Sequence, residues 1–112
     1  MKEVQKVWGK EVWVVNCEEY CGKLLYVDKG AVSSEHYHKV KQETFCCIQG
    51  QVELQVGDRH YYLEPLSEAV TIMPKQVHCF KGVANKSILM EVSTIHSDKD
   101  VFRNTESQKG QE

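Results

Sequence analysis

The sequence predicts an all-β fold with a single domain, built as a sandwich or barrel of short strands. Apolar and β-branched runs of about four to six residues recur at intervals of roughly 8–12 residues, with turn-forming residues between them. No window keeps the apolar period of about 3.6 residues long enough to predict a helix. The length of 112 residues suits one domain with one modest core.

The first half of the chain contains three predicted strands. Residues 12–15 are a run of β-branched and aromatic side chains. Residues 24–27 form a second run, which ends at the turn-forming sequence Asp28-Lys29-Gly30. Residues 44–48 form a third run, and Gln49-Gly50 closes it.

The second half begins with the clearest strand pattern in the sequence. Residues 51–56 alternate strictly between polar and apolar side chains, which is the period of a half-buried strand. The pattern stops at the turn residues Gly57-Asp58. Extended structure is expected to resume in four further segments, at residues 60–63, 69–73, 79–80 and 87–92.

The last residues of the chain have a different composition from the rest. Residues 104–112 carry almost no hydrophobic side chain and are rich in Ser, Gln, Lys and Gly, so we expect a disordered C-terminal tail. The sequence contains no internal repeat and no sign of a second domain. We therefore expect residues 1–103 to form the folded domain.

Charge and cysteine content exclude several classes of protein. The 14 Lys and Arg nearly balance the 16 Asp and Glu, so the net charge of −2 gives no electrostatic reason to expect nucleic acid or a membrane surface as a partner. No apolar run approaches the roughly 20 residues of a membrane-spanning helix, and the first residues are too polar for a signal peptide. We expect a cytoplasmic protein whose five cysteines stay reduced.

Three of the five histidines lie where their side chains can converge. His36 and His38 are two residues apart, so on an extended strand both point to the same face. Glu43 begins the next predicted strand, and His78 lies beside a later one. Imidazoles and a carboxylate are common ligands of transition metals. The pattern alone leaves a second interpretation open, namely surface or hydrogen-bonded histidines without a metal.

Two glycines frame these residues at fixed intervals and support the metal interpretation. The sequence follows Gly-x5-His-x-His-x4-Glu-x6-Gly from Gly30 to Gly50, and both glycines end strands where positive φ is expected. This spacing resembles the first motif of the cupins and matches it completely. The resemblance extends over roughly residues 8–103.

The second cupin motif reads Gly-x5-Pro-x-Gly-x2-His-x3-Asn, and of its five fixed positions this sequence matches only the histidine, at His78. Aligned on that residue, the sequence has Ser67 and Lys75 at the two Gly positions, Met73 at the Pro position and Gly82 at the Asn position. The missing glycines leave the geometry of the turn before His78 open.

The resemblance implies a cupin barrel, a double-stranded β-helix or jelly roll, with a metal inside one end. It implies one divalent transition metal per chain, which is manganese, zinc, iron or nickel, held by His36, His38, Glu43 and His78. Four protein ligands leave positions of an octahedral metal open for a substrate or ligand. The ligand types do not distinguish among these metals.

A finer resemblance is to small sugar-handling cupins of the D-lyxose isomerase and mannose-6-phosphate isomerase groups. It rests on His36-x-His38-x2-Lys41-x-Glu43, on residues 8–13 and on residues 91–96. It implies an aldose–ketose isomerase with a carbohydrate substrate, working through a metal-stabilised enediolate. It further implies that Lys41 is catalytic and that Glu91, late in an apolar strand, is the general base.

Other interpretations stay open from the sequence. The chain can be a non-catalytic cupin that binds a metal and a sugar as an accessory to carbohydrate metabolism, or an iron dioxygenase. Lys41 can equally be a solvated loop charge, and Glu91 can face solvent or pair with a cation. His96 and Arg103 can cap the pocket or bind a phosphate. We also expect a homodimer in which residues 8–15 cover a sheet edge.

Overall fold

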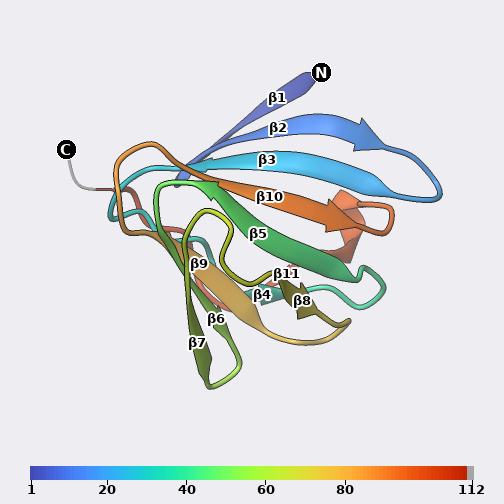
Figure 1. Ribbon diagram of the computed structural model, residues 1–112. Coiled ribbons are helices and arrows are strands. Elements are labelled where there is room, and N and C mark those ends of the chain that lie inside the picture. Colours follow the sequence, from blue (N-terminus) through green and yellow to red (C-terminus); the bar gives the residue numbers. More distant parts are fainter. Residues whose placement is uncertain (111–112) are drawn as a thin grey trace.

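The chain folds into two antiparallel sheets that close into a barrel (Figure 1). The computed structural model describes residues 1–110. The larger sheet has the strand order β1-β2-β3-β10-β5-β8, formed by Lys2–Lys6, Gly9–Asn16, Cys21–Val27, Ser87–Ser93, Glu43–Gln49 and Val70–Ile72. The smaller sheet has the order β11-β4-β9-β6-β7, formed by Phe102–Arg103, His36–Tyr37, His78–Gly82, Val52–Val56 and Arg59–Leu63. One short 3₁₀ helix, η1 (Asp98–Asp100), joins β10 to β11.

The all-β prediction is confirmed, and each of the eight predicted segments overlaps a strand. The strands β1, β4 and β11 were not predicted. Residues 8–15, which we expected to cover an edge, lie mostly in β2, and β2 pairs with β1 on one side and β3 on the other. The edge of the larger sheet is therefore β1. The described residues contain no helix that is long and apolar enough to cross a membrane.

Alternation along the strands places the apolar core between the sheets. In β3, every second residue is buried, and the same holds for the first five residues of β5. Leu25, Phe45, Leu54 and Leu89 are each at most 2% exposed. Trp8 also lies in this core, with its ring edge-to-face against Phe80 at a centroid distance of 4.9 Å. The buried side chains include a second group that is charged or polar.

Residues 104–110 differ from the expected disordered tail. Asn104 donates its N–H to the carbonyl of Glu35, and Val32 and Gln108 exchange two backbone hydrogen bonds of 2.8 and 3.0 Å. This segment therefore lies along residues 32–35. The prediction was based on side-chain composition, which carries no information about backbone pairing of this kind. Residues 111–112 of the predicted tail lie outside the described residues.

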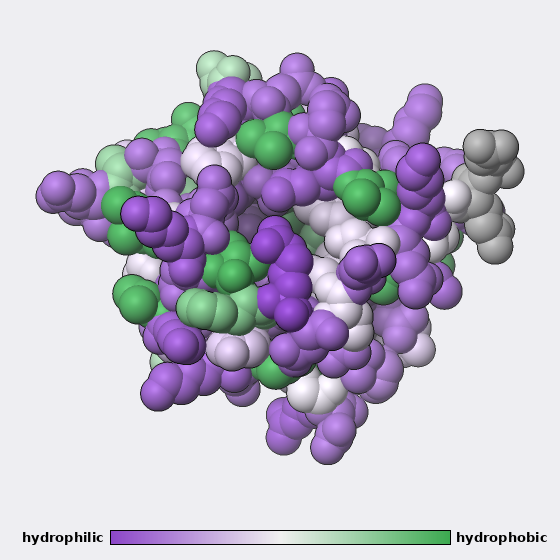
Figure 2. Space-filling model, turned by 180° about the vertical axis from the view of Figure 1, so that it is seen from behind, coloured by the Kyte–Doolittle hydropathy of each residue, from purple (hydrophilic) through white to green (hydrophobic). Residues whose placement is uncertain are grey.

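The surface is mostly hydrophilic on the face that Figure 2 presents. Hydrophilic side chains predominate there, and hydrophobic residues lie in small groups between them. His60, at the start of β7, belongs to the polar surface and pairs with Glu53 at 3.0 Å.

Candidate metal centre

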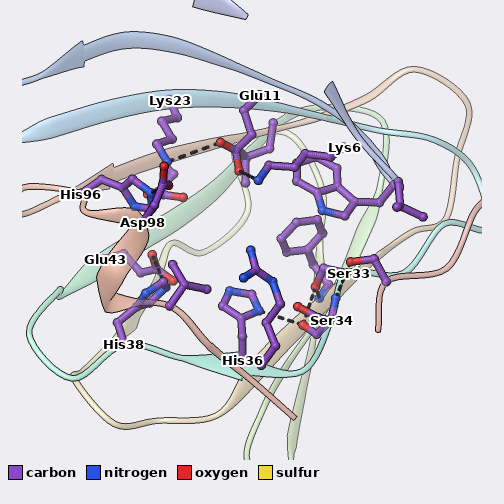
Figure 3. Close-up of a pocket in the computed structure, with 18 of the residues that line it drawn as sticks. Lys6, Glu11, Lys23, Ser33, Ser34, His36, His38, Glu43, His96 and Asp98 are labelled. Atoms are coloured by element: carbon purple, nitrogen blue, oxygen red, sulfur yellow. Dashed lines mark hydrogen bonds and ion pairs between the residues drawn. The ribbon is translucent and has the colours of Figure 1, made fainter. Parts of the chain in front are cut away.

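Four side chains from three strands and their ends meet inside the barrel. His36 lies in β4 and His38 directly follows it, while Glu43 opens β5 and His78 opens β9. Each offers one ligand atom, and these atoms all lie within 4.8 Å of one another. Figure 3 shows His36, His38 and Glu43 along one side of a pocket. The structure thus brings together the four side chains that the sequence singles out as metal ligands.

Each of the three imidazoles is fixed by a backbone carbonyl on its outer side. The Nδ1 atoms donate to the carbonyl oxygens of Ser34 (2.8 Å, from His36), Asp100 (2.8 Å, from His38) and Gln76 (2.9 Å, from His78). Because a carbonyl only accepts, the proton of each neutral ring must lie on Nδ1. Each Nε2 therefore carries a free lone pair, as a metal ligand requires.

Three buried atoms of this cluster, both carboxylate oxygens of Glu43 and Nε2 of His78, have no hydrogen-bond partner within residues 1–110. Oε1 of Glu43 and Nε2 of His78 lie 2.7 Å apart, yet neither completes a hydrogen bond within residues 1–110. Two lone pairs that face each other at this distance repel, and buried atoms of this kind are costly without a partner. A divalent cation bound between these atoms would remove the repulsion and would give each atom a partner. The donor set and its unpaired atoms therefore fit a metal ion.

The electrostatics keep these ligands in their metal-binding forms. Burial, with a smaller effect from His78, lowers the pKa of His36 to about 3, so that ring is neutral at physiological pH. Burial alone would raise the pKa of Glu43. The Lys41 ammonium, 3.1 Å away, opposes the effect of burial and holds that pKa well below its ordinary value. A neutral imidazole beside a carboxylate is the form that a transition metal binds.

Lys41 and Glu91 lie in the wall of the same pocket. Nζ of Lys41 is 3.1 Å from Oε2 of Glu43 and 2.8 Å from Oε2 of Glu91. Lys41 is only 3% exposed and Glu91 only 5%, so neither is a solvated surface charge. Burial alone would lower the pKa of Lys41, but the two carboxylates outweigh it and raise that pKa above its ordinary value.

Asp100, in η1, organises the loop that carries these residues and was missed in the sequence. Its carboxylate accepts hydrogen bonds from the backbone N–H groups of Lys39 (2.8 Å), Val40 (3.2 Å) and Lys41 (3.0 Å). Its carbonyl holds the ring of His38. One residue therefore positions both a candidate ligand and the loop that presents Lys41.

The pocket is a cavity of about 280 Å³ with charged walls. Figure 3 shows Lys6, Glu11 and Lys23 on the side opposite His36 and His38. Nζ of Lys23, whose side chain is 1% exposed, lies 3.5 Å from Oε1 of Glu11. Burial would raise the pKa of Glu11, but Lys23 and a hydrogen bond from Trp13 lower it. Sequence reasoning did not find Glu11 or Lys23, because each lies one residue before a predicted strand run, at residues 12–15 and 24–27, where no pattern indicates the direction of its side chain.

Comparison with known families gives this architecture a name. The model of the cupin domain matches residues 23–93. This chain belongs to the cupin family. The jelly-roll cupin barrel expected from the sequence is therefore confirmed.

Solved structures of other cupins share the fold at low sequence identity. KdgF from Halomonas sp. is 18% identical, with 80% of this chain and 81% of that chain covered and a TM-score of 0.74. CapF, a capsular polysaccharide assembling protein from Staphylococcus aureus, is 13% identical with a TM-score of 0.78. The matched region includes 91% of this chain and 33% of the CapF chain. PAC13 from Streptomyces, solved with uridine, is 12% identical with a TM-score of 0.77 and coverages of 93% and 84%. These identities show the fold alone, and no curated protein matches the sequence.

The turn before His78 shows how this cupin departs from the second motif. Lys75, at the second Gly position of that motif, has a φ of +73°, which is the left-handed conformation that glycine adopts most easily. Its N–H donates to the carbonyl of His38 at 2.5 Å. The turn geometry is therefore kept although the glycine is absent, and it is tied to the residue that carries a candidate ligand.

The remaining residues of interest divide between the cavity and the rest of the cupin barrel. His96 and Arg103 line the cavity, as one of the sequence interpretations requires, and His96 contacts Lys41. Tyr37 stacks on Phe102 with the ring centroids 5.3 Å apart, so it packs between β4 and β11. All five cysteines are free, and burial raises the pKa of Cys21, Cys47 and Cys79, which disfavours their reactive thiolate forms.

Proposed function

We propose that this cupin is a metal-dependent isomerase that interconverts the aldose and ketose forms of a sugar or sugar phosphate. The observation that carries the proposal is the meeting of two groups in one cavity. One is a cluster of three imidazoles and a carboxylate, and the other is the buried pair of Lys41 and Glu91. Proton transfer next to a polarised carbonyl needs both kinds of group.

His36, His38, Glu43 and His78 would hold the metal. When bound, it would supply positive charge for the carbonyl oxygen and the neighbouring hydroxyl oxygen of an open-chain sugar. Glu91 takes the proton from C2 of the aldose and returns it to C1, while the hydroxyl proton of O2 moves to O1, so the carboxylate is regenerated and the step balances. Lys41 keeps a positive charge beside Glu91 and faces the cavity in which the substrate oxygens gain negative charge.

The walls of the cavity support a carbohydrate over the small apolar substrates that we associate with a dioxygenase. Glu11, Lys23 and Ser34 line it together with the catalytic pair, and such groups exchange hydrogen bonds with hydroxyls. A volume of about 280 Å³ is suited to a small molecule. CapF, with the same fold, is described as assembling capsular polysaccharide, and PAC13 was solved with uridine, which contains a sugar.

A second function is favoured by one specific observation. The ammonium of Lys41 lies within 3.1 Å of two carboxylate oxygens and of Nδ1 of His96, so its charge is already paired within the protein in this arrangement. Glu91 is likewise engaged in an ion pair. A cupin that binds a metal and a sugar without catalysis would keep these charges paired in this way.

Deuterium exchange distinguishes the two functions. The protein is loaded in turn with manganese, zinc, iron and nickel and incubated in deuterated water with a panel of aldoses, ketoses and their phosphates. We expect deuterium at C1 or C2 of at least one sugar, and we expect Glu91→Gln to abolish its incorporation. Glu53→Gln, the same change on the surface, serves as the control. Sugar binding without exchange under any metal would refute the isomerase and support the binding protein.

We also propose that the cupin works as a homodimer. The outer edge of β1 has no partner strand within residues 1–110, and an unpaired edge favours pairing with a second copy. Analytical ultracentrifugation should give twice the chain mass of 12.9 kDa. A monomer at all concentrations would contradict this.

A further inference from the structure

The ammonium of Lys41 has a third contact in addition to its two ion pairs. An ammonium has three N–H groups, and Nζ of Lys41 has three acceptors within reach. Two are the carboxylates of Glu43 and Glu91, and the third is Nδ1 of His96 at 3.1 Å. The lysine side chain has a flexible four-carbon stem, so attraction to the two carboxylates alone does not fix the position of the ammonium. The contact with Nδ1 of His96 restricts the ammonium from a third side.

His96 is itself fixed from several sides, although it lies between β10 and η1 rather than in a strand. Its N–H donates to Oδ1 of Asn16 at 2.9 Å, and its carbonyl accepts from Nδ2 of the same residue at 3.1 Å. Its ring meets Trp13 edge-to-face at a centroid distance of 5.2 Å. Backbone and ring are therefore both anchored to β2, across 80 residues of sequence.

The two ring nitrogens of His96 have partners of opposite kinds. Nε2 lies 3.0 Å from Oδ1 of Asp98, which can only accept, whereas Nδ1 faces the Lys41 ammonium, which can only donate. A neutral ring satisfies both partners in one tautomer alone, with its proton on Nε2. A protonated ring would direct an N–H at the ammonium. Burial first, and then the charges of Lys41 and Lys23, lower the pKa of His96 to about 4, in agreement with a neutral ring.

We propose that His96, fixed in its Nε2–H tautomer by Asp98, is a positioning residue that holds the Lys41 ammonium in the cavity wall. The positioning itself is independent of the reaction, but its importance for turnover rests on the proposed isomerase function. Since the imidazole is neutral, it is the weakest of the three acceptors of Lys41. It is therefore the contact that a substrate oxygen displaces when Lys41 acts on the substrate.

The test measures the hydrogen bond directly by NMR on zinc-loaded protein labelled with nitrogen-15 in lysine and histidine. We expect His96 to show a protonated Nε2 and an unprotonated Nδ1. We expect the ammonium protons of Lys41 to exchange with water about tenfold faster in His96→Phe, as the loss of one hydrogen bond allows. The ammonium of Lys23, which does not bond to His96, is the internal control, and His60→Phe is the matched surface variant.

Asp98 provides a variant that does not threaten the fold, because its side chain is 85% exposed. Asp98→Ala should accelerate the exchange at Lys41, whereas Asp98→Asn, whose amide oxygen still accepts from Nε2–H, should restore the wild-type rate. Unchanged exchange at Lys41 in both His96→Phe and Asp98→Ala, or a protonated Nδ1 in the wild type, overturns the proposal. Since no sugar is present, these outcomes are independent of the isomerase assay. If that assay succeeds, His96→Phe should lower kcat more than it raises KM.

Discussion

Removal of the Asp100 carboxylate should loosen the loop that joins the metal centre to Lys41. In Asp100→Ala, three backbone N–H groups at residues 39–41 lose a charged acceptor at 2.8 to 3.2 Å. A hydrogen bond to a charged group contributes about 1.5–3 kcal/mol when buried, and less here because water can replace the half-exposed carboxylate. At about 1 kcal/mol each, the free energy of unfolding should fall by about 3 kcal/mol. For a domain of this size, Tm should fall by on the order of 10 °C.

Urea denaturation of the metal-free protein measures this loss. Burial would raise the pKa of Asp100, but its three backbone hydrogen bonds lower it below its ordinary value of 3.8. The stabilisation is therefore complete above pH 3.8 and is lost as the pH falls through the lower folded-state pKa, so the gap between variant and wild type should close in acid. Asp98→Ala, two residues earlier, is the control, since that carboxylate bonds only the side chain of His96. A loss below about 0.5 kcal/mol at pH 7 would refute the reasoning.

Asp100→Ala should also weaken metal binding by about tenfold, because the same residue orients the ring of His38 through its carbonyl. Competition with a fluorescent chelator measures this affinity. Unchanged affinity would mean that the carbonyl keeps its position without the loop contacts.

Three further predictions concern the metal, pH and the backbone. His78→Ala should abolish stoichiometric metal in elemental analysis, and metal retained at one ion per chain would exclude this residue as a ligand. Because the pKa of His96 is about 4 in the folded protein and 6.5 ordinarily, the unfolded chain binds more protons between these values. His96 alone should therefore cost metal-free protein about 3 kcal/mol of stability as the pH falls from 6.5 to 4, and His96→Phe should make that part of the profile less steep, while the slope due to His36 remains. Gly50→Ala should cost about 3 kcal/mol, since its φ is +74° and a Cβ would lie 2.5 Å from a side-chain oxygen of β10. Gly57→Ala, at φ +57° with open space, should cost only about 1 kcal/mol, and equal losses would contradict the steric argument.

Local patterns were sufficient for eight of the eleven strands that the described residues form and for the four candidate ligands. The alternation in residues 51–56 predicts β6 and its buried face, because side-chain direction in a strand repeats every two residues. His36 and His38 follow the same rule, and the framing glycines carry the cupin spacing. Lys75 shows the limit of such motifs, because the left-handed turn is present although the glycine is not.

The rest of the site depends on contacts that no local pattern contains. Asp100 bonds to a loop about 60 residues earlier, and His96 bonds to Asn16 and Lys41 across 80 and 55 residues. A two-residue strand such as β11 (Phe102–Arg103) is too short to show a period. Its pairing with β4 is visible only once the barrel has closed.

The distribution of buried charge along the strands indicates which part of the fold serves function. In β3 and β10, the inward residues include Leu25, Val27 and Leu89 toward one end of the barrel, and Lys23 and Glu91 toward the other. Apolar side chains of similar volume would stabilise that second end at least as well, because burying a charge costs several kcal/mol even when it is paired. Fold stability therefore gives no reason for Lys23 and Glu91 to be charged. A ligand that needs fixed charges in a cavity shielded from water does give one, and it predicts that apolar replacement of both ion pairs, Lys23 with Glu11 and Lys41 with Glu91, would produce a barrel that still folds but is inactive.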